Sequence, residues 1–291
     1  MRREGGGLRR HPARTHRLGA AAELCDCELS KTQASTYYQH SDLSVVHHTA
    51  ERPRPLAGVL GVVAQVRGRG KTMPDFAIER QCQGLVCGID EAGRGPLAGP
   101  VVAAAVILDS RRFPKMLRGE LDDSKVLTRE QREACYRALR RCADRGVARI
   151  GVGAASTVEI DRLNILRAAL LAMARAVAVL GVRPDTALVD GAIAPPLACA
   201  VRTVVKGDAL SFSIAAASVV AKVTRDRIMR GLAPRYPGYG WETNVGYATQ
   251  EHGEAIRRLG ITRHHRRSFA PMRLADVGDL PLFAALGAGP L

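Results

Sequence analysis

The stretch from Leu85 to Val102, LVCGIDEAGRGPLAGPVV, constrains this chain more than any other part of it. It begins as a short apolar run, typical of a buried strand, and two adjacent carboxylates, Asp90 and Glu91, stand at the end of that run. Neighbouring carboxylates repel each other and lose hydration when they are buried, unless a cation lies beside them. The glycines that follow allow the backbone to turn and to approach a ligand closely. The stretch therefore indicates either a metal site beside a space of phosphate or sugar size, or an ordinary strand–turn–strand with a charged turn.

The composition bounds the class of protein. The chain has 291 residues and a formal net charge of +15, which favours a polyanionic partner, nucleic acid first. Its longest apolar stretch, residues 168–182, is interrupted by Arg175 and is too short to cross a bilayer. No apolar segment follows the N-terminal arginines, so neither a signal peptide nor a membrane partner is expected. The seven cysteines lack zinc-knuckle spacing and are typical of reduced thiols in a cytoplasmic protein.

Residues 1–72 differ from the rest of the chain. They are rich in Arg, His and Gly and keep neither a helical nor a strand period, which predicts a disordered basic extension. Met73 looks like the natural entry to the folded part. We therefore expect a catalytic domain over residues 73–291, with C-terminal helices and a short flexible tail after about residue 275.

From residue 81 onward, strand-like and helix-like segments alternate, which indicates an α/β domain. A capping box at Thr128 and Gln131 predicts the start of a helix that runs to about Ala143. Two strands joined by a tight turn, one ending at Asp90 and one at 101–108, suggest that part of the sheet is antiparallel. The remaining predicted strands are 148–156, 186–189 and 200–205. One further helical region is predicted to begin at residue 157, and the other predicted helices are 164–180, 211 to about 231, and 249–259.

Four acidic residues stand out by position. Asp90 and Glu91 end one strand, Asp190 ends another just before a glycine, and Asp226 lies on the long helix. Ligands bind at the carboxyl ends of strands in such sheets, so these side chains can converge there. Carboxylates without Cys or His favour Mg²⁺ or Mn²⁺, and two such ions about 3.5–4 Å apart can clamp a phosphoryl displacement. The alternatives are that Asp190 is a turn former and that Asp226 pairs with Arg225 or Arg230 on its own helix.

A set of motifs occurs in one order along the chain: GIDEAGRGPLAGPVVAAAVIL, DSKVLT, VDG, KGD, SIAAASVVAKVTRD, YPGYGW, GYATQEH and HHRRSF. In this order the chain resembles ribonuclease HII, over about residues 83–270. The resemblance implies a ribonuclease H-like fold, with a five-stranded mixed sheet flanked by helices and a C-terminal helical extension. It also implies two Mg²⁺ or Mn²⁺ ions, hydrolysis of the RNA strand in RNA–DNA hybrids, and incision 5′ of a ribonucleotide embedded in duplex DNA. We expect a monomer.

The resemblance also implies roles for particular residues. The family's catalytic and metal-binding carboxylates correspond to Asp90, Glu91, Asp190 and Asp226. Its Gly-Arg-Gly element, which contacts the ribose 2′-hydroxyl, corresponds to Gly93, Arg94 and Gly95, and its sugar-stacking tyrosine to Tyr247. Core packing is the alternative for Tyr247. The chain departs from the family at Val126 and Val245, where a lysine is often found.

Basic residues near these motifs are candidates for phosphate contacts, which supply salt-dependent affinity without sequence information. They are Lys125, Lys206, Lys222 and the cluster Arg263–Arg267. For Lys222 the alternative is an ion pair with Asp226 or Asp190.

Two other functions compete with this interpretation. A nucleic-acid-binding protein without enzymatic activity would use the basic surface alone, but converging carboxylates would repel phosphate in the absence of a metal. Another nuclease or recombinase of the same fold superfamily would share the carboxylates and lack the Gly-Arg-Gly, SIAAAS and GYATQEH elements.

Overall fold

The computed structural model describes residues 73–121, 127–270 and 272. Its strands are β1 (Val86–Ala92), β2 (Val101–Leu108), β3 (Ala148–Ala155), β4 (Thr186–Asp190) and β5 (Ala200–Val204). Its helices are α1 (Ala77–Arg80), α2 (Lys115–Glu120), α3 (Arg129–Asp144), α4 (Thr157–Leu163), α5 (Ile165–Ala178), α6 (Phe212–Leu232), α7 (Trp241–Asn244) and α8 (Gln250–Leu259), with short 3₁₀ turns η2 (Gly207–Ala209) and η3 (Ala233–Arg235).

The strands form one five-stranded sheet in the order β3-β2-β1-β4-β5. Strand β2 pairs antiparallel with both β1 and β3, whereas β4 pairs parallel with both β1 and β5. The predicted mixed sheet, with its early antiparallel pair, is confirmed. The short connection after β1 brings β2 back alongside it, whereas β4 is reached only after the chain has passed through four helices.

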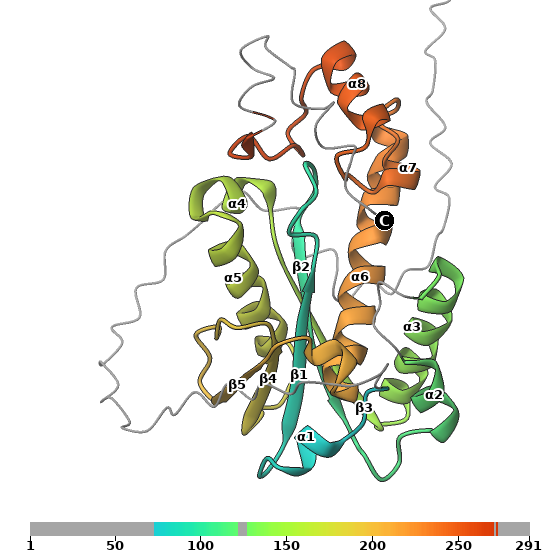
Figure 1. Ribbon diagram of the computed structural model, residues 1–291, viewed down its shortest axis with the longest axis vertical. Coiled ribbons are helices and arrows are strands. Elements are labelled where there is room, and N and C mark those ends of the chain that lie inside the picture. The colour runs from blue at the N-terminus through green and yellow to red at the C-terminus, as the bar shows by residue number, and fades with distance from the viewer. Residues whose placement is uncertain (1–72, 122–126, 271, 273–291) are drawn as a thin grey trace, which may run out of the picture. The chain divides into compact units, whose positions relative to one another are not determined.

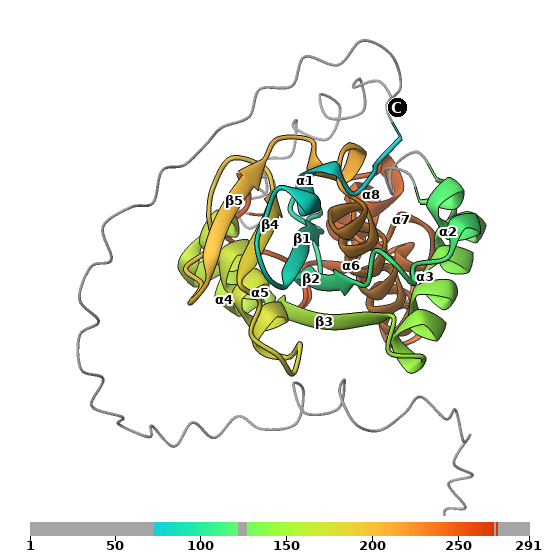
Figure 2. The ribbon, with the colours of Figure 1, turned by 90° about the horizontal axis from the view of Figure 1, so that it is seen from below.

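Helices cover both faces of the sheet (Figure 2). One face packs against α4 and α5 through a core that includes Ile89, Ala172 and Val189. The other face packs against α6, with α3 beyond it, through a core that includes Ala104, Leu139 and Val220. Because aromatic residues make up only 4% of the chain, this core is built mostly from small and aliphatic side chains.

Small residues let α6 lie directly against β1. A Cβ atom on Gly88 would come within 2.1 Å of the backbone carbon of Ser213, and one on Gly93 within 2.0 Å of Nε of Arg225. The helix therefore advances in the same direction as the strand, with its start beside Gly88 and its fourth turn beside Gly93. This alignment brings the second half of α6 level with the end of β1.

The C-terminal part of the described chain packs around Trp241, which is fully buried with Tyr239, Val245 and Ile256 close by. Helices α7 and α8 lie near the end of β1 and the start of β2, in the upper right of Figure 1. An isolated antiparallel bridge between Ala98 and His265 ties the segment after α8 to the loop between β1 and β2. The C-terminal helices thus attach to the loop that follows the paired carboxylates.

Most predicted elements are confirmed, and a few differ. Both hydrogen bonds of the capping box at Thr128 and Gln131 are present. Strand β1 continues past Asp90 to Ala92, because β2 pairs with it over that length. Helices α1, α2 and α7 were not predicted.

Some predictions concern residues that the structure does not describe. The predicted extension over residues 1–72 and the tail after about residue 275 lie outside them, as does Lys125. Of the cysteines in the described ranges, none forms a disulfide, and Cys87, Cys135 and Cys142 are buried. No helix in these ranges is long and apolar enough to cross a membrane.

Candidate active site

Two parallel strands bring Asp90 and Asp190 side by side. Ile89 and Val189 are partners in the pairing of β1 with β4, and each aspartate is the next residue on its strand. The side chain of Asp90 is buried, with 5% of the residue exposed. Glu91 follows on β1 and is partly buried. The strand register thus places Asp90 beside Asp190 at the ends of two neighbouring strands.

The electrostatics of Asp90 reflect this crowding. Burial raises the pKa of Asp90 well above its usual range, and the charges of Glu91 and Asp190 raise it further. Hydrogen bonds from the Ser218 hydroxyl and from the Glu91 N–H act in the opposite direction. Asp190 is held by the backbone: its Oδ1 accepts a hydrogen bond of 2.7 Å from the N–H of Gly207. A bound cation would relieve the repulsion among these carboxylates.

Asp226 lies on α6, on the same helical face as Ser218, and only 4% of it is exposed. Its Oδ1 is 2.9 Å from Nζ of Lys222, and its Oδ2 is 3.7 Å from Nη2 of Arg230. The alternative interpretations, in which Asp226 pairs with a helix arginine and Lys222 pairs with Asp226, thus both describe contacts that exist. The ion pair with Lys222 is part of the environment that any metal ion at Asp226 would enter.

The donor chemistry of these side chains fits a divalent ion, because carboxylate oxygens are the ligands that Mg²⁺ and Mn²⁺ prefer. Across the described ranges, no three His, Cys, Asp or Glu side chains are grouped closely enough to hold an ion as they stand. The charges of Glu91 and Asp190 act on Asp90, while Asp226 pairs with cations. The single cluster of four ligands stays a prediction.

The Gly-Arg-Gly segment follows β1 immediately. Gly93 is buried and has φ of +92°, whereas Arg94 and Gly95 are exposed. Of these two glycines, only Gly93 has a positive φ. Nothing lies within 4 Å of a Cβ built on Gly95. Gly93 is therefore required by the packing of the loop on Arg225, and Gly95 faces open space.

Tyr247 lies beside the Lys222 and Arg225 side chains of α6, and 42% of the residue is exposed. The Lys222 ammonium is 5.4 Å from the centre of its ring, and the Arg225 guanidinium carbon is 5.7 Å from it. This exposure rules out core packing as the role of the ring. An exposed aromatic ring therefore lies beside Lys222 and Arg225, which contact Asp226 and the Gly-Arg-Gly loop respectively.

Comparison with known proteins decides the family. The model of the ribonuclease HII family matches residues 87–272, more than half of the chain. Ribonuclease HII of Rhodospirillum rubrum is 58% identical over 203 residues, which are 70% of this chain and 92% of that protein. This chain belongs to the ribonuclease HII family. It is accordingly a metal-dependent endoribonuclease, which excludes the non-enzymatic alternative.

Solved structures agree with the fold. The ribonuclease H2 of Pyrococcus horikoshii OT3 is 28% identical to the enzyme, with a TM-score of 0.55, over 67% of this chain and 98% of that one. Bst-RNase HIII, solved in complex with Mn²⁺, is 19% identical with a TM-score of 0.54, over 66% of this chain and 69% of that one. At that identity the second likeness concerns the fold alone. The predicted ribonuclease H-like fold is confirmed.

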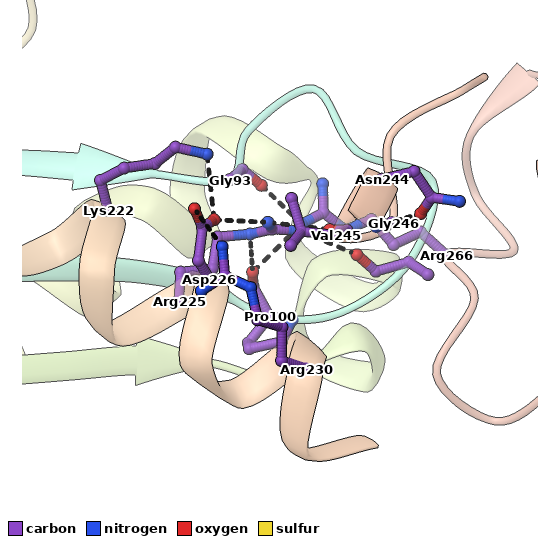
Figure 3. Close-up of polar contacts among 11 residues, drawn as sticks. Gly93, Pro100, Lys222, Arg225, Asp226, Arg230, Asn244, Val245, Gly246 and Arg266 are labelled. Atoms are coloured by element: carbon purple, nitrogen blue, oxygen red, sulfur yellow. Dashed lines mark hydrogen bonds and ion pairs between the residues drawn. The ribbon is translucent and has the colours of Figure 1, made fainter. Parts of the chain in front are cut away.

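In this enzyme, two buried arginines hold the loop that follows β1 (Figure 3). Arg225 and Arg266 have no exposed surface, and each donates to several backbone carbonyls. Arg225 donates to the carbonyls of Pro100 (3.2 Å), Val245 (3.0 Å) and Ala98 (3.1 Å). Arg266 donates to those of Gly99 (3.0 Å), Arg94 (2.8 Å), Gly93 (2.5 Å) and Pro100 (3.3 Å).

These contacts correct one expectation. The predicted phosphate-binding cluster Arg263–Arg267 cannot use Arg266, because its guanidinium is turned inward onto carbonyls. Sequence reasoning also did not identify Arg225 as part of the site. Both arginines stand in the motifs VTRD and HHRRSF, but nothing in a motif shows whether an arginine faces solvent or backbone.

A second buried network holds the backbone of Tyr247. The Thr262 N–H donates to Nδ1 of His265 (2.8 Å), so the neutral His265 ring carries its proton on Nε2 and donates to Nε2 of His252 (3.2 Å). Trp241 Nε1 donates to the same nitrogen of His252 (3.1 Å). His252 Nδ1 then donates to the carbonyl of Tyr247 (2.8 Å). Every ring nitrogen is used, and the network fixes the segment that presents the tyrosine.

The candidate lysines differ in their surroundings. Lys206 is exposed and adopts a left-handed backbone conformation with φ of +56°. Lys222 is partly buried and lies between Asp226 and the Tyr247 ring. Lys125 lies outside the described residues. Of the two candidates within the described residues, Lys222 is the one whose ammonium pairs with a candidate carboxylate.

Proposed function

We propose that this enzyme hydrolyses the RNA strand of RNA–DNA hybrids and incises duplex DNA on the 5′ side of an embedded ribonucleotide. The observation that carries the proposal is the junction at the end of β1 between the carboxylates Asp90 and Glu91 and the exposed backbone of Arg94 and Gly95. Carboxylates supply ligands for a metal, and an accessible backbone can bind the 2′-hydroxyl that distinguishes RNA from DNA.

Asp90, Glu91, Asp190 and Asp226 would hold two Mg²⁺ or Mn²⁺ ions. Such ions, when bound, lower the pKa of a water molecule and stabilise charge on the leaving oxygen. With water as the nucleophile instead of the neighbouring 2′-hydroxyl, the products carry 5′-phosphate and 3′-hydroxyl ends. Asp226 also orients Lys222, whose ammonium lies 2.9 Å from its carboxylate.

The remaining residues would bind and orient the duplex. The exposed ring of Tyr247 offers a face on which a sugar can pack. Lys222, the exposed Lys206 and Lys125 would bind backbone phosphates, which adds affinity without sequence preference. Removal of ribonucleotides from genomic DNA by a cytoplasmic monomer would be the corresponding role.

An incision assay with three matched duplexes tests the proposal. One duplex is all DNA, one carries a single ribonucleotide, and one is a full RNA–DNA hybrid, each with and without Mg²⁺. We expect cleavage of the second and third only, only with the metal, and with a 3′-hydroxyl at the cut. Cleavage of the all-DNA duplex, or equal cleavage without a divalent ion, would contradict the proposal.

Replacement of one carboxylate tests the assignment of the site. We expect Asp90→Asn to abolish cleavage in saturating Mg²⁺ and to leave duplex binding largely intact, because it removes a negative ligand and changes little in shape. The matched control is Asp144→Asn, at the exposed end of α3 away from β1. Near-normal turnover by Asp90→Asn would show that Asp90 is not a metal ligand.

A further inference from the structure

The guanidinium of Arg266 controls which way two peptide groups face. Arg266 is fully buried, and its guanidinium donates to the carbonyls of Gly93 and Arg94 at 2.5 and 2.8 Å. The bridge between Ala98 and His265 delivers it there, with the Arg266 N–H donating to the carbonyl of Leu97 at 2.9 Å. A residue 172 positions further along the chain thus fixes the backbone of the Gly-Arg-Gly segment.

The geometry of the peptide bond carries this contact to the opposite side of the loop. A trans peptide is planar, so the C=O of one residue and the N–H of the next point in opposite directions, and the described chain has no cis peptide. Because the carbonyls of Gly93 and Arg94 point inward to Arg266, the N–H groups of Arg94 and Gly95 point outward.

These two N–H groups are available to a ligand. Within the described residues, neither of them donates to a backbone or side-chain acceptor. Arg94 and Gly95 are exposed, and no atom lies within 4 Å of a Cβ built on Gly95. Two adjacent donors therefore face open space within four residues of the carboxylate of Glu91.

An arginine is suited to this position for a physical reason. Its planar fork can donate to two neighbouring carbonyls at once, which a lysine ammonium cannot match in geometry. Burial and the neighbouring Arg225 guanidinium lower the pKa of Arg266 to about 9, which leaves it a cation at pH 7. Burying a cation on carbonyls is costly unless its donors are well used, and here three of its nitrogens have acceptors.

We propose that Arg266 is a positioning residue for ribonucleotide recognition, which draws the carbonyls of Gly93 and Arg94 inward and thereby aims the N–H groups of Arg94 and Gly95 at the 2′-hydroxyl. This inference rests on the proposed function and adds a determinant of specificity to it. Arg266 touches neither the substrate nor the carboxylates, so it acts through the loop.

The test measures discrimination in binding, with Ca²⁺ in place of Mg²⁺ to prevent cleavage. The affinities of wild type and Arg266→Lys are compared for a duplex with one ribonucleotide and for the matched all-DNA duplex. We expect the ratio of the two affinities to fall about tenfold in Arg266→Lys, the value of about one lost hydrogen bond. Affinity for the all-DNA duplex should change less than about twofold, because the substitution keeps the positive charge.

Arg175→Lys is the matched control. Arg175 also holds a backbone carbonyl, that of Ala154 at 2.8 Å, and a carboxylate, that of Glu159 at 2.7 Å, but on α5 and away from the loop. It should lower the unfolding midpoint in urea and leave the affinity ratio unchanged. If both variants lower the ratio equally, the effect is general loosening of the fold, and the positioning role is refuted.

A measurement on the wild-type chain covers the case in which Arg266→Lys does not fold. In ¹⁵N NMR spectra, the amide signals of Arg94 and Gly95 should shift with the ribonucleotide duplex and not with the all-DNA duplex. Equal shifts with both duplexes, or an unchanged affinity ratio in a folded Arg266→Lys, overturn the inference. If wild type incises neither substrate with Mg²⁺, the proposed function itself fails.

Discussion

Gly93 and Gly95 are separated by a single arginine, yet the structure predicts opposite consequences when each is replaced by alanine. At Gly93, φ is +92°, and a Cβ would lie 2.0 Å from Nε and 2.3 Å from Cδ of Arg225. At Gly95, φ is not in the left-handed region, and the Cβ would meet nothing within 4 Å. Comparing the two substitutions therefore distinguishes a glycine required for packing, Gly93, from a glycine that leaves space for a ligand, Gly95.

The cost at Gly93 can be estimated from two contributions. A left-handed backbone at a residue with a Cβ costs about 1–2 kcal/mol. Displacing the buried Arg225 side chain breaks at least one of its hydrogen bonds to carbonyls, which costs about 1–3 kcal/mol more. Gly93→Ala should therefore lower the free energy of unfolding by about 2–5 kcal/mol, whereas Gly95→Ala should change it by less than about 0.5 kcal/mol.

Urea unfolding followed by circular dichroism measures both values, with the slope of the transition compared to confirm that the variants unfold like wild type. Cleavage of the single-ribonucleotide duplex should fall in Gly95→Ala, because the added methyl occupies the space that a sugar would approach. Equal stabilities of the two variants would refute the packing argument for Gly93. Full activity of Gly95→Ala would refute the approach of the substrate to that side of the loop.

Three further predictions concern other parts of the molecule. Tyr247→Ala should reduce kcat/KM on a single embedded ribonucleotide more than on a long hybrid, because only the former presents an RNA–DNA junction; equal losses would refute a junction-sensing role. Burial, with the neighbouring histidines, lowers the pKa of His265 to about 3, below its unfolded value of about 6.5. The unfolded state therefore binds the extra proton more tightly, and the free energy of unfolding should fall by up to about 1.4 kcal/mol per pH unit as the pH drops below about 6.5. Free energies of unfolding measured in urea from pH 7 to 4 should show this slope in wild type and a smaller one in His265→Gln. A chain that begins at Met73 should melt cooperatively and keep its cleavage activity, whereas loss of either would place part of residues 1–72 in the functional unit.

Local sequence patterns determined most of the secondary structure. The capping box at Thr128 and Gln131 and the apolar runs of β1 and β2 depend on residues close together in the chain, so their outcome can be inferred from spacing. The end of β1 was one exception. Pairing with β2 extends it to Ala92, and that pairing depends on two segments and not on one.

The sequence also indicated which carboxylates to place in the candidate site, because Asp90 and Asp190 each follow an apolar run and strand ends carry ligands in α/β folds. Their convergence was predicted for the same reason, but the strand order behind it was not. Strand β1 pairs parallel with β4, which aligns Ile89 with Val189. The ion pair of Asp226 with Lys222 follows from helical spacing alone, four residues apart, and could be anticipated.

Tertiary structure alone decided the roles of the two buried arginines and of Gly93. Arg225 and Arg266 are ordinary cations in the sequence, and the basic cluster around Arg266 predicted phosphate contacts. Only packing shows that their guanidinium groups turn inward to carbonyls of the loop after β1. The physical reason is that a hydrogen bond to a backbone carbonyl needs no particular partner side chain. No local pattern in the sequence marks a carbonyl as an acceptor for a residue far along the chain.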